Sequence, residues 1–193
     1  MKKIAAFILL TALVSTAFKP FGGVEGKMFP TMQCENYNGK KVVIPAETKG
    51  KYTLLGLAFS NDAESDLKTW INPVYNKFIV KTDQSQADAF DVHQEYDVHL
   101  YFIPMFTGLN QLTSKQSKEK IKSHTDKELY DYLLFYQGDK SYKEELNFEK
   151  KDTPYFFVLD KTGKIVYATS GKYDDKKKEK IILPRPTYLS FVV

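Results

Sequence analysis

The chain has 193 residues, 42% of them hydrophobic and 27% charged, and its formal net charge is +4. This length and composition fit one globular domain with a sizeable core. The charge is too small to favour nucleic acid or an anionic surface as a partner, so we expect no nucleic-acid partner. A single cysteine, Cys34, excludes an internal disulfide.

The N-terminus has the three parts of a secretory signal peptide. Two lysines follow the first residue, residues 4–14 are apolar, and residues 15–17 are small residues typical of a cleavage site. The apolar run is shorter than the ~20 residues that a membrane span needs. We therefore expect residues 1–17 to be removed and residues 18–25 to form a leader. The mature chain would have no transmembrane segment and would be exported, either to the periplasm or as a secreted protein.

A hairpin and a buried strand are predicted next. Asn38-Gly39 lies between two strand-like runs within residues 31–45, and Asn-Gly tolerates the positive φ of a tight hairpin turn. Residues 53–59, TLLGLAF, are almost all apolar, which predicts a central strand buried on both faces. Gly56 inside this strand indicates close packing against a neighbour.

An amphipathic helix is predicted directly after this strand. Pro73 lies within it and predicts a kink or break, because proline lacks an N–H and its ring would clash with the carbonyl of Thr69. The apolar residues fall at helical spacing on one face: Leu67, Trp70, Ile71, Val74, Tyr75 and Phe78.

The middle of the chain predicts one more strand and further helix. Residues 97–102 alternate and then become apolar, which suits a second strand of the sheet. Residues 113–137 predict helix in one or two pieces. Residues 125–128 form a capping box and Gly138 is a plausible helix end.

The last third predicts a hairpin over residues 155–169, with a tight turn at 160–163, followed by a short helix. The lysine-rich run at 176–180 is interpreted as a solvated helix face, with contact to an acidic partner or lipid head groups as the alternative. We place the folded domain at residues 26–183. The tail at 184–193, with two prolines, is left open as an edge strand, a docking strand or a disordered segment.

This order of elements resembles the thioredoxin-like superfamily, specifically its exported redoxin and peroxiredoxin-type branch. The resemblance covers residues 26–173 and is carried by three matches: 26–30 with the hairpin that follows, 53–70, and 153–166. It implies an α/β, three-layer fold with a central mixed sheet flanked by helices, an N-terminal hairpin and a helical insertion.

The resemblance also implies a binding groove. In that superfamily a cis proline precedes the second hairpin, packs against the active-site turn and leaves a backbone edge open to an extended peptide. The matching positions are Thr153, Pro154 and Tyr155, so the resemblance implies a cis bond before Pro154 and a groove at these three residues.

The active-site turn departs from the superfamily because it contains no sulfur. That chemistry needs a thiolate, and none can form in the turn Ser60, Asn61, Asp62, Ala63, Glu64, Ser65. Asn61 and Glu64 stand roughly where two cysteines could stand. We interpret the turn as a degenerate active site in which Ser60, Asn61 or Asp62 caps the helix. A serine nucleophile paired with a distant histidine is the open alternative.

Two other places were weighed as sites. Cys34 is interpreted as a buried structural cysteine, with a reactive surface thiol as the alternative. Asp91, His93, Glu95, Asp97 and His99 are spaced by two and would share one face of a strand. Such side chains bind divalent metals, but neighbours on a face lie ~6.6–6.8 Å apart, so four in line cannot close around one ion. We favour a polar strand entry and expect neither metal nor cofactor.

The sequence therefore predicts a non-redox thioredoxin-fold module of the cell envelope that binds a protein or peptide, in an assembly or chaperone-like role. A fainter similarity, through the outline and the sequence FVLDKTGKIVY, links the chain to cysteine-free thioredoxin-like factors that assist assembly of the membrane ATP synthase. The alternatives are an atypical thiol oxidoreductase or peroxidase using Cys34, a metal- or serine-dependent enzyme, and an accessory domain without a small ligand. We predict no catalytic residue.

Overall fold

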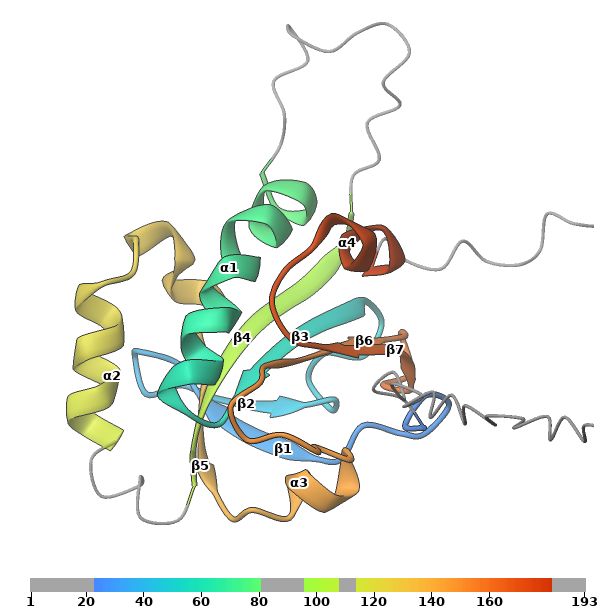
Figure 1. Cartoon of the computed structure of the whole chain (residues 1–193), viewed down its shortest axis with the longest axis horizontal. Coiled ribbons are helices and arrows are strands. Elements are labelled where there is room, and N and C mark those ends of the chain that lie inside the picture. The colour runs from blue at the N-terminus through green and yellow to red at the C-terminus, as the bar shows by residue number, and fades with distance from the viewer. Residues whose placement is uncertain (1–22, 81–95, 108–113, 182–193) are drawn as a thin grey trace, which may run out of the picture.

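A seven-stranded mixed sheet forms the centre of the domain, in the order β2-β1-β5-β4-β3-β6-β7 (Figure 1). The structure, a computed structural model, describes residues 23–80, 96–107 and 114–181. The predicted signal peptide and the tail at 184–193 lie outside these residues. Within the described ranges, no helix has the length and apolar character needed to cross a membrane.

The strands are β1 Met32–Glu35, β2 Lys41–Ile44, β3 Tyr52–Ala58, β4 Val98–Thr107, β5 Phe135–Gly138, β6 Tyr155–Leu159 and β7 Ile165–Ser170. The helices are α1 Asn61–Phe78, α2 Ser114–Ser123, the 3-10 helix η3 Lys127–Tyr132, α3 Tyr142–Glu145 and α4 Asp175–Ile181. The predicted N-terminal hairpin, buried strand, following helix and second hairpin are all confirmed.

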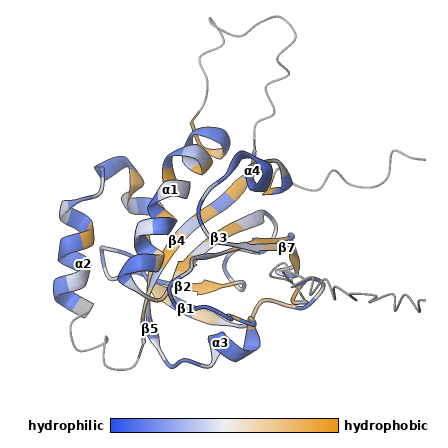
Figure 2. Cartoon of the chain, in the orientation of Figure 1, coloured by the Kyte–Doolittle hydropathy of each residue, from blue (hydrophilic) through white to orange (hydrophobic). Residues whose placement is uncertain are grey.

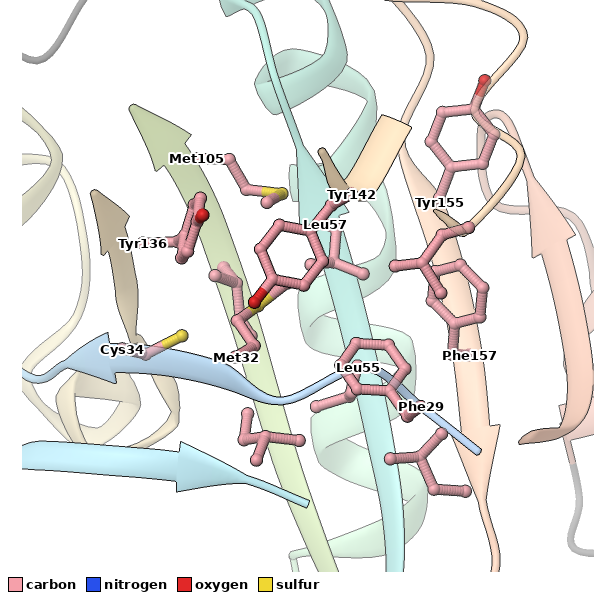
Figure 3. Packing of buried hydrophobic residues seen from close by; sticks show 14 of the residues in the cluster. Phe29, Met32, Cys34, Leu55, Leu57, Met105, Tyr136, Tyr142, Tyr155 and Phe157 are labelled. Carbon is pink, nitrogen blue, oxygen red and sulfur yellow. The ribbon is translucent and has the colours of Figure 1, made fainter. Parts of the chain in front are cut away.

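Strand β3 is buried on both faces, as its apolar run predicts. It pairs in parallel with β4 and antiparallel with β6, and six of its seven residues are buried. Leu54 and Ala58 face the cluster that contains Trp70 and Phe156, under α1. Residues 55 and 57 face the opposite cluster, which Figure 3 shows from close by. The strand colours of Figure 2 show the same concentration of hydrophobic residues at the centre.

The helix α1 runs through Pro73 without ending there, so the predicted break does not occur. The residues on either side, Trp70 and Val74, are buried against the sheet, and this packing outweighs the lost hydrogen bond. Trp70 stacks on Phe156 with ring centroids 4.1 Å apart, and its Nε1–H donates to the Gly171 carbonyl at 2.8 Å. These contacts fix the helix on one face of β3 and β6.

The hairpin β1–β2 forms in the register Met32 opposite Ile44, although its turn is wider than the Asn-Gly pair suggests. Gly39 has a φ of +76° and Asn38 does not share the positive φ of a type I′ turn. The side chain of Asn36 closes the turn instead, because its Oδ1 accepts from the N–H groups of residues 38 and 40.

The prediction of helix to residue 137 is wrong at its C-terminal end. Residues 135–138 form β5, which pairs antiparallel with β1 and in parallel with β4. Phe135 and Tyr136 are both buried, so burial within the sheet overrides the helical spacing of the sequence. The capping box does not form either: Asp126 is the N-cap residue without a side-chain bond, and Thr125 donates to the Ile121 carbonyl.

Strand β4 extends beyond the predicted 97–102, to Thr107. It pairs first with β3, as far as Ala58 opposite Pro104, and from Met105 onward with β5. Pro104 therefore lies where one ladder ends and the next begins, a place that tolerates a residue without an N–H. This extension carries residues 105–107 to the same end of the sheet as the start of α1.

Gly56 allows the closest approach of β3 to its neighbours. A Cβ at this position would lie 2.7 Å from Cε1 of Phe156 and 2.8 Å from Cδ1 of Leu67. We predict that Gly56→Ala lowers the free energy of unfolding by about 1–3 kcal/mol, because overpacked cores lose that amount. Denaturant unfolding followed by the fluorescence of Trp70 measures the change. Gln33→Ala, at an exposed strand position, is the control and should stay within about 0.5 kcal/mol; equal effects of the two changes would contradict this packing.

Candidate functional site

Ser60 caps α1 at the turn where the superfamily carries its sulfur. Its backbone is extended, with φ −145° and ψ 165°, and its Oγ accepts from the Ala63 N–H at 3.2 Å. The same hydroxyl donates to the carbonyl of Lys151 at 3.4 Å. Ser60 therefore joins the start of the helix to a segment 91 positions away along the chain.

The rest of the turn is polar and partly exposed. Asn61, Asp62 and Ser65 are exposed, and the Ser65 hydroxyl donates to the Asn61 carbonyl at 3.0 Å. Both serine hydroxyls are thus engaged with backbone groups. The described histidines lie elsewhere: His99 stacks on Tyr101, and His124 bonds to the carbonyl of Lys120. Among the residues that the structure describes, no histidine is therefore placed as a base for either serine.

Glu64 is the charged residue of the turn that is half-buried. Burial raises the pKa of its carboxyl, while the positive charges of Lys68 and Lys120 act in the opposite direction. The carboxylate therefore lies in a partly desolvated place with lysines on two sides.

A pocket of about 490 Å³ opens beside this turn. Its lining residues come from the ends of β3 and β4, the first turn of α1, the helix α2 and the segment around α3, elements that Figure 1 labels. Pockets of this size hold small ligands or a few side chains of a partner. Its lining residues are Phe59, Ser60, Asn61, Glu64, Met105, Phe106, Thr107, Ser117, Lys140, Lys143 and Lys151.

The floor and rim of the pocket differ in character. Phe59, Met105 and Phe106 are buried core residues that reach it from β3 and β4. Lys140 and Lys151 are exposed, and Lys143 is half-buried, with its Nζ 5.4 Å from the ring centre of Phe59. The pocket thus combines an apolar floor with a basic rim.

The predicted groove residues are absent from the lining of this pocket, and they follow directly on the segment that contains Lys151. Pro154 and Tyr155 are buried and Thr153 is half-buried. The Tyr155 hydroxyl accepts from the N–H of Lys150 at 2.7 Å and donates to its carbonyl at 2.9 Å. Tyr155 therefore holds the segment that brings Lys151 to Ser60.

The expected cis bond before Pro154 is wrong. Among the described residues, the cis peptide bond is Ile44–Pro45. The trans isomer is the lower-energy form of an X-Pro bond by about 0.5–1 kcal/mol, and only the resemblance favoured the other isomer. Pro154 still leads directly into β6, and its carbonyl accepts from the Gly171 N–H at 2.9 Å.

Cys34 is absent from the lining of this pocket, although it lies opposite Tyr136, which in turn lies opposite the lining residue Met105. Cys34 is buried on β1, and the strands β5, β4 and β3 separate β1 from β6. Figure 3 shows Cys34 and Tyr155 on opposite sides of the core. Burial raises the pKa of the thiol to about 12, so thiolate is scarce near neutral pH.

The polar run on the way into β4 is only partly described, since residues 91, 93 and 95 fall in the range outside the description. Asp97 pairs with Lys51 at 2.6 Å. Burial and the charge of Lys51 lower the pKa of His99, with Asp97 acting the other way. In the ranges that the structure covers, no group of three or more metal-ligating side chains gathers.

Sequence reasoning identified the turn at 60–65 but did not identify the rest of the pocket. The sequence alone assigns no role to the lysines at 140, 143 and 151, and the predicted strand ends at residue 102, before residues 105–107. The concentration of lysines within residues 140–151 was the feature of the sequence that could have indicated this part of the site.

The sheet order, the helix that follows the buried strand and the second hairpin define a thioredoxin-like α/β fold. The turn at the start of α1 has no Cys-x-x-Cys pair. Residues 21–183 match the family described as ATP10 protein, and the chain belongs to that family.

Several solved structures of thiol-disulfide proteins are similar to this chain. A Chlorobium tepidum structure assigned as a thiol:disulfide interchange protein DsbE has a TM-score of 0.50 and 14% identity, covering 82% of this chain and 94% of that one. The thio-disulfide isomerase of Thermus thermophilus has a TM-score of 0.49 and 15% identity, with coverage of 81% and 92%. The thioredoxin domain of a Bacteroides vulgatus thiol-disulfide oxidoreductase has a TM-score of 0.46 and 19% identity, covering 82% of this chain and 98% of that one. No curated protein matches the chain.

We predict that Cys34 reacts slowly with iodoacetamide in the folded protein at pH 8 and rapidly in urea. Burial suppresses the thiolate and blocks access to the sulfur. Mass spectrometry of the alkylated protein over time gives both rates. Equal rates in the folded and unfolded protein would contradict the buried position and revive the reactive-thiol alternative.

Proposed function

We propose that this protein is a non-redox thioredoxin-fold module that binds a segment of a partner protein in the pocket beside Ser60. Its role is to assist the assembly of that partner. The proposal includes export: the mature protein acts in the cell envelope after removal of residues 1–17.

The observation that carries this proposal is the pocket at the start of α1. Phe59 and Phe106 form its floor and lysines form its rim, while the turn that carries the reactive sulfur in the superfamily contains a helix-capping serine and no cysteine. A pocket that has no reactive sulfur is still suited to binding a partner.

Family membership supports an assembly role. The ATP10 match spans nearly all of the described domain. The sequence similarity to cysteine-free factors that assist assembly of the ATP synthase points the same way. The alternative of an oxidoreductase using Cys34 has little support, because that thiol is buried and the strands β5, β4 and β3 separate it from β6.

We predict that a photo-crosslinking amino acid at position 61 captures a discrete partner protein in native cells. Asn61 is exposed and lines the pocket, so a bound segment would lie within reach. Illumination followed by gel separation and mass spectrometry identifies the adduct. The same amino acid at position 176, an exposed place on α4, is the matched control.

The proposal requires an adduct from position 61 that position 176 does not give. Identical adducts from both positions, or none from position 61, would refute binding at this pocket. Reduction of insulin disulfides by the purified protein would refute the non-redox part separately.

We also predict that the protein recovered from the envelope fraction begins near residue 18. Residues 15–17 have the small side chains that signal peptidase accepts. Intact-mass measurement of the purified native protein locates the first residue. A full-length chain in the cytoplasmic fraction would overturn the proposed export.

A further inference from the structure

We propose that the partner segment bound by this pocket is acidic, with carboxylate side chains that pair with Lys140, Lys143 and Lys151. This inference rests on the proposed function and adds the chemistry of the occupant. The residues 108–113, which follow Thr107, lie outside the description and form no part of the proposal.

The lysines of the rim are available for an incoming charge. Among the described residues, neither Lys140 nor Lys143 has a carboxylate within ion-pair distance. Lys151 lies 3.9 Å from Asp152, but both side chains are well exposed, and such pairs contribute little. Three ammonium groups around one opening attract an anionic segment.

The single carboxylate in the lining does not cancel this field. Glu64 faces Lys68 and Lys120, which neutralise part of its charge from α1 and α2. The lining therefore contains three lysines and one glutamate, and the charge of that glutamate is also opposed by two lysines that do not line the pocket. Figure 2 shows hydrophilic residues along α2 and α3, the two elements that flank the opening.

The floor favours an acidic side chain with a hydrocarbon stem. Lys143 already lies over the ring of Phe59, and Phe59 packs edge-on to Phe148 at 4.8 Å. A glutamate entering here places its carboxylate among the lysines and its methylene groups against the small part of Phe59 and Phe106 that the pocket exposes. A small anion would use the charges but not the floor, which makes a peptide the better match.

The experiment measures binding of fluorescein-labelled peptides to the mature protein by fluorescence polarisation. The acidic probe has a glycine-serine backbone with four glutamates, and its matched control replaces each glutamate with glutamine. We expect the acidic peptide to bind and the glutamine peptide to bind at least tenfold more weakly. Binding should weaken as ionic strength rises, because salt screens exposed charges.

Variants that remove a positive charge and a variant that removes a negative charge should change the peptide affinity in opposite directions. Lys140→Gln and Lys143→Gln should each weaken binding about two- to fivefold, the size expected of one partly exposed ion pair. Glu64→Gln removes the opposing charge and should tighten binding by a similar factor. Lys41→Gln, at an exposed position of β2 outside the pocket lining, should change nothing. The emission of buried Trp70 checks that each variant is folded.

The outcomes separate this inference from the proposed function. A partner captured at position 61 together with equal binding of both peptides would overturn the acidic segment and leave the binding role intact. Binding that millimolar inorganic phosphate abolishes, or that anionic phospholipid vesicles outcompete, would assign the lysines to another anion and overturn the inference. Equal losses from Lys41→Gln and Lys143→Gln would also overturn it, because the pocket would then have no special part.

Discussion

The strand β3 sets the position of nearly every other element, because it is paired on both edges and buried on both faces. It pairs with the middle strand β4 on one edge and with β6 on the other, and its side chains enter both core clusters. The chain leaves β3 at its C-terminal end. Residue 59 is still in the core, and residue 60 caps the start of the helix α1. The site is a direct consequence of this exit.

The same strand end also explains why the fold needs no cysteine at this turn. The start of α1 needs an acceptor for its unpaired N–H groups, and the Ser60 hydroxyl provides one. That hydroxyl also reaches the carbonyl of Lys151, so the cap and the wall of the pocket share one contact. Tyr155 then fixes the wall through residue 150. The Ser60 hydroxyl thus holds the start of α1 against the wall of the pocket without any sulfur in the turn.

Local patterns predicted the parts of the fold whose signals are local. The apolar run of β3, the stripe from Leu67 to Phe78 and the hairpin of β6 and β7 were all identified, since burial and turn chemistry act within a few residues. Strand β5 was missed because Tyr136 continues the helical spacing of Leu129, Tyr132 and Leu133. Residues 135–138 acquire their strand character only by pairing with β1 and β4. The family resemblance also gave the wrong isomer at Pro154.

The pocket could not be predicted for a related reason. Its walls come from residues 59–64, 105–107, 117 and 140–151, which only the completed sheet brings together. The sequence alone indicates a candidate site at the first of these segments and gives no role to the last. The sequence of a connecting segment does not show which of its lysines lies over an aromatic ring, as Lys143 lies over Phe59.

The most direct test of the account is the backbone amide NMR spectrum of the labelled mature protein, recorded as the partner segment identified in cells is added. Binding in the pocket predicts shift changes at residues 59–64, 105–107 and 140–151, with β2 and β7 unchanged. Changes confined to the sheet edges β2 or β7, with the signals of residues 59–64 in place, would contradict it.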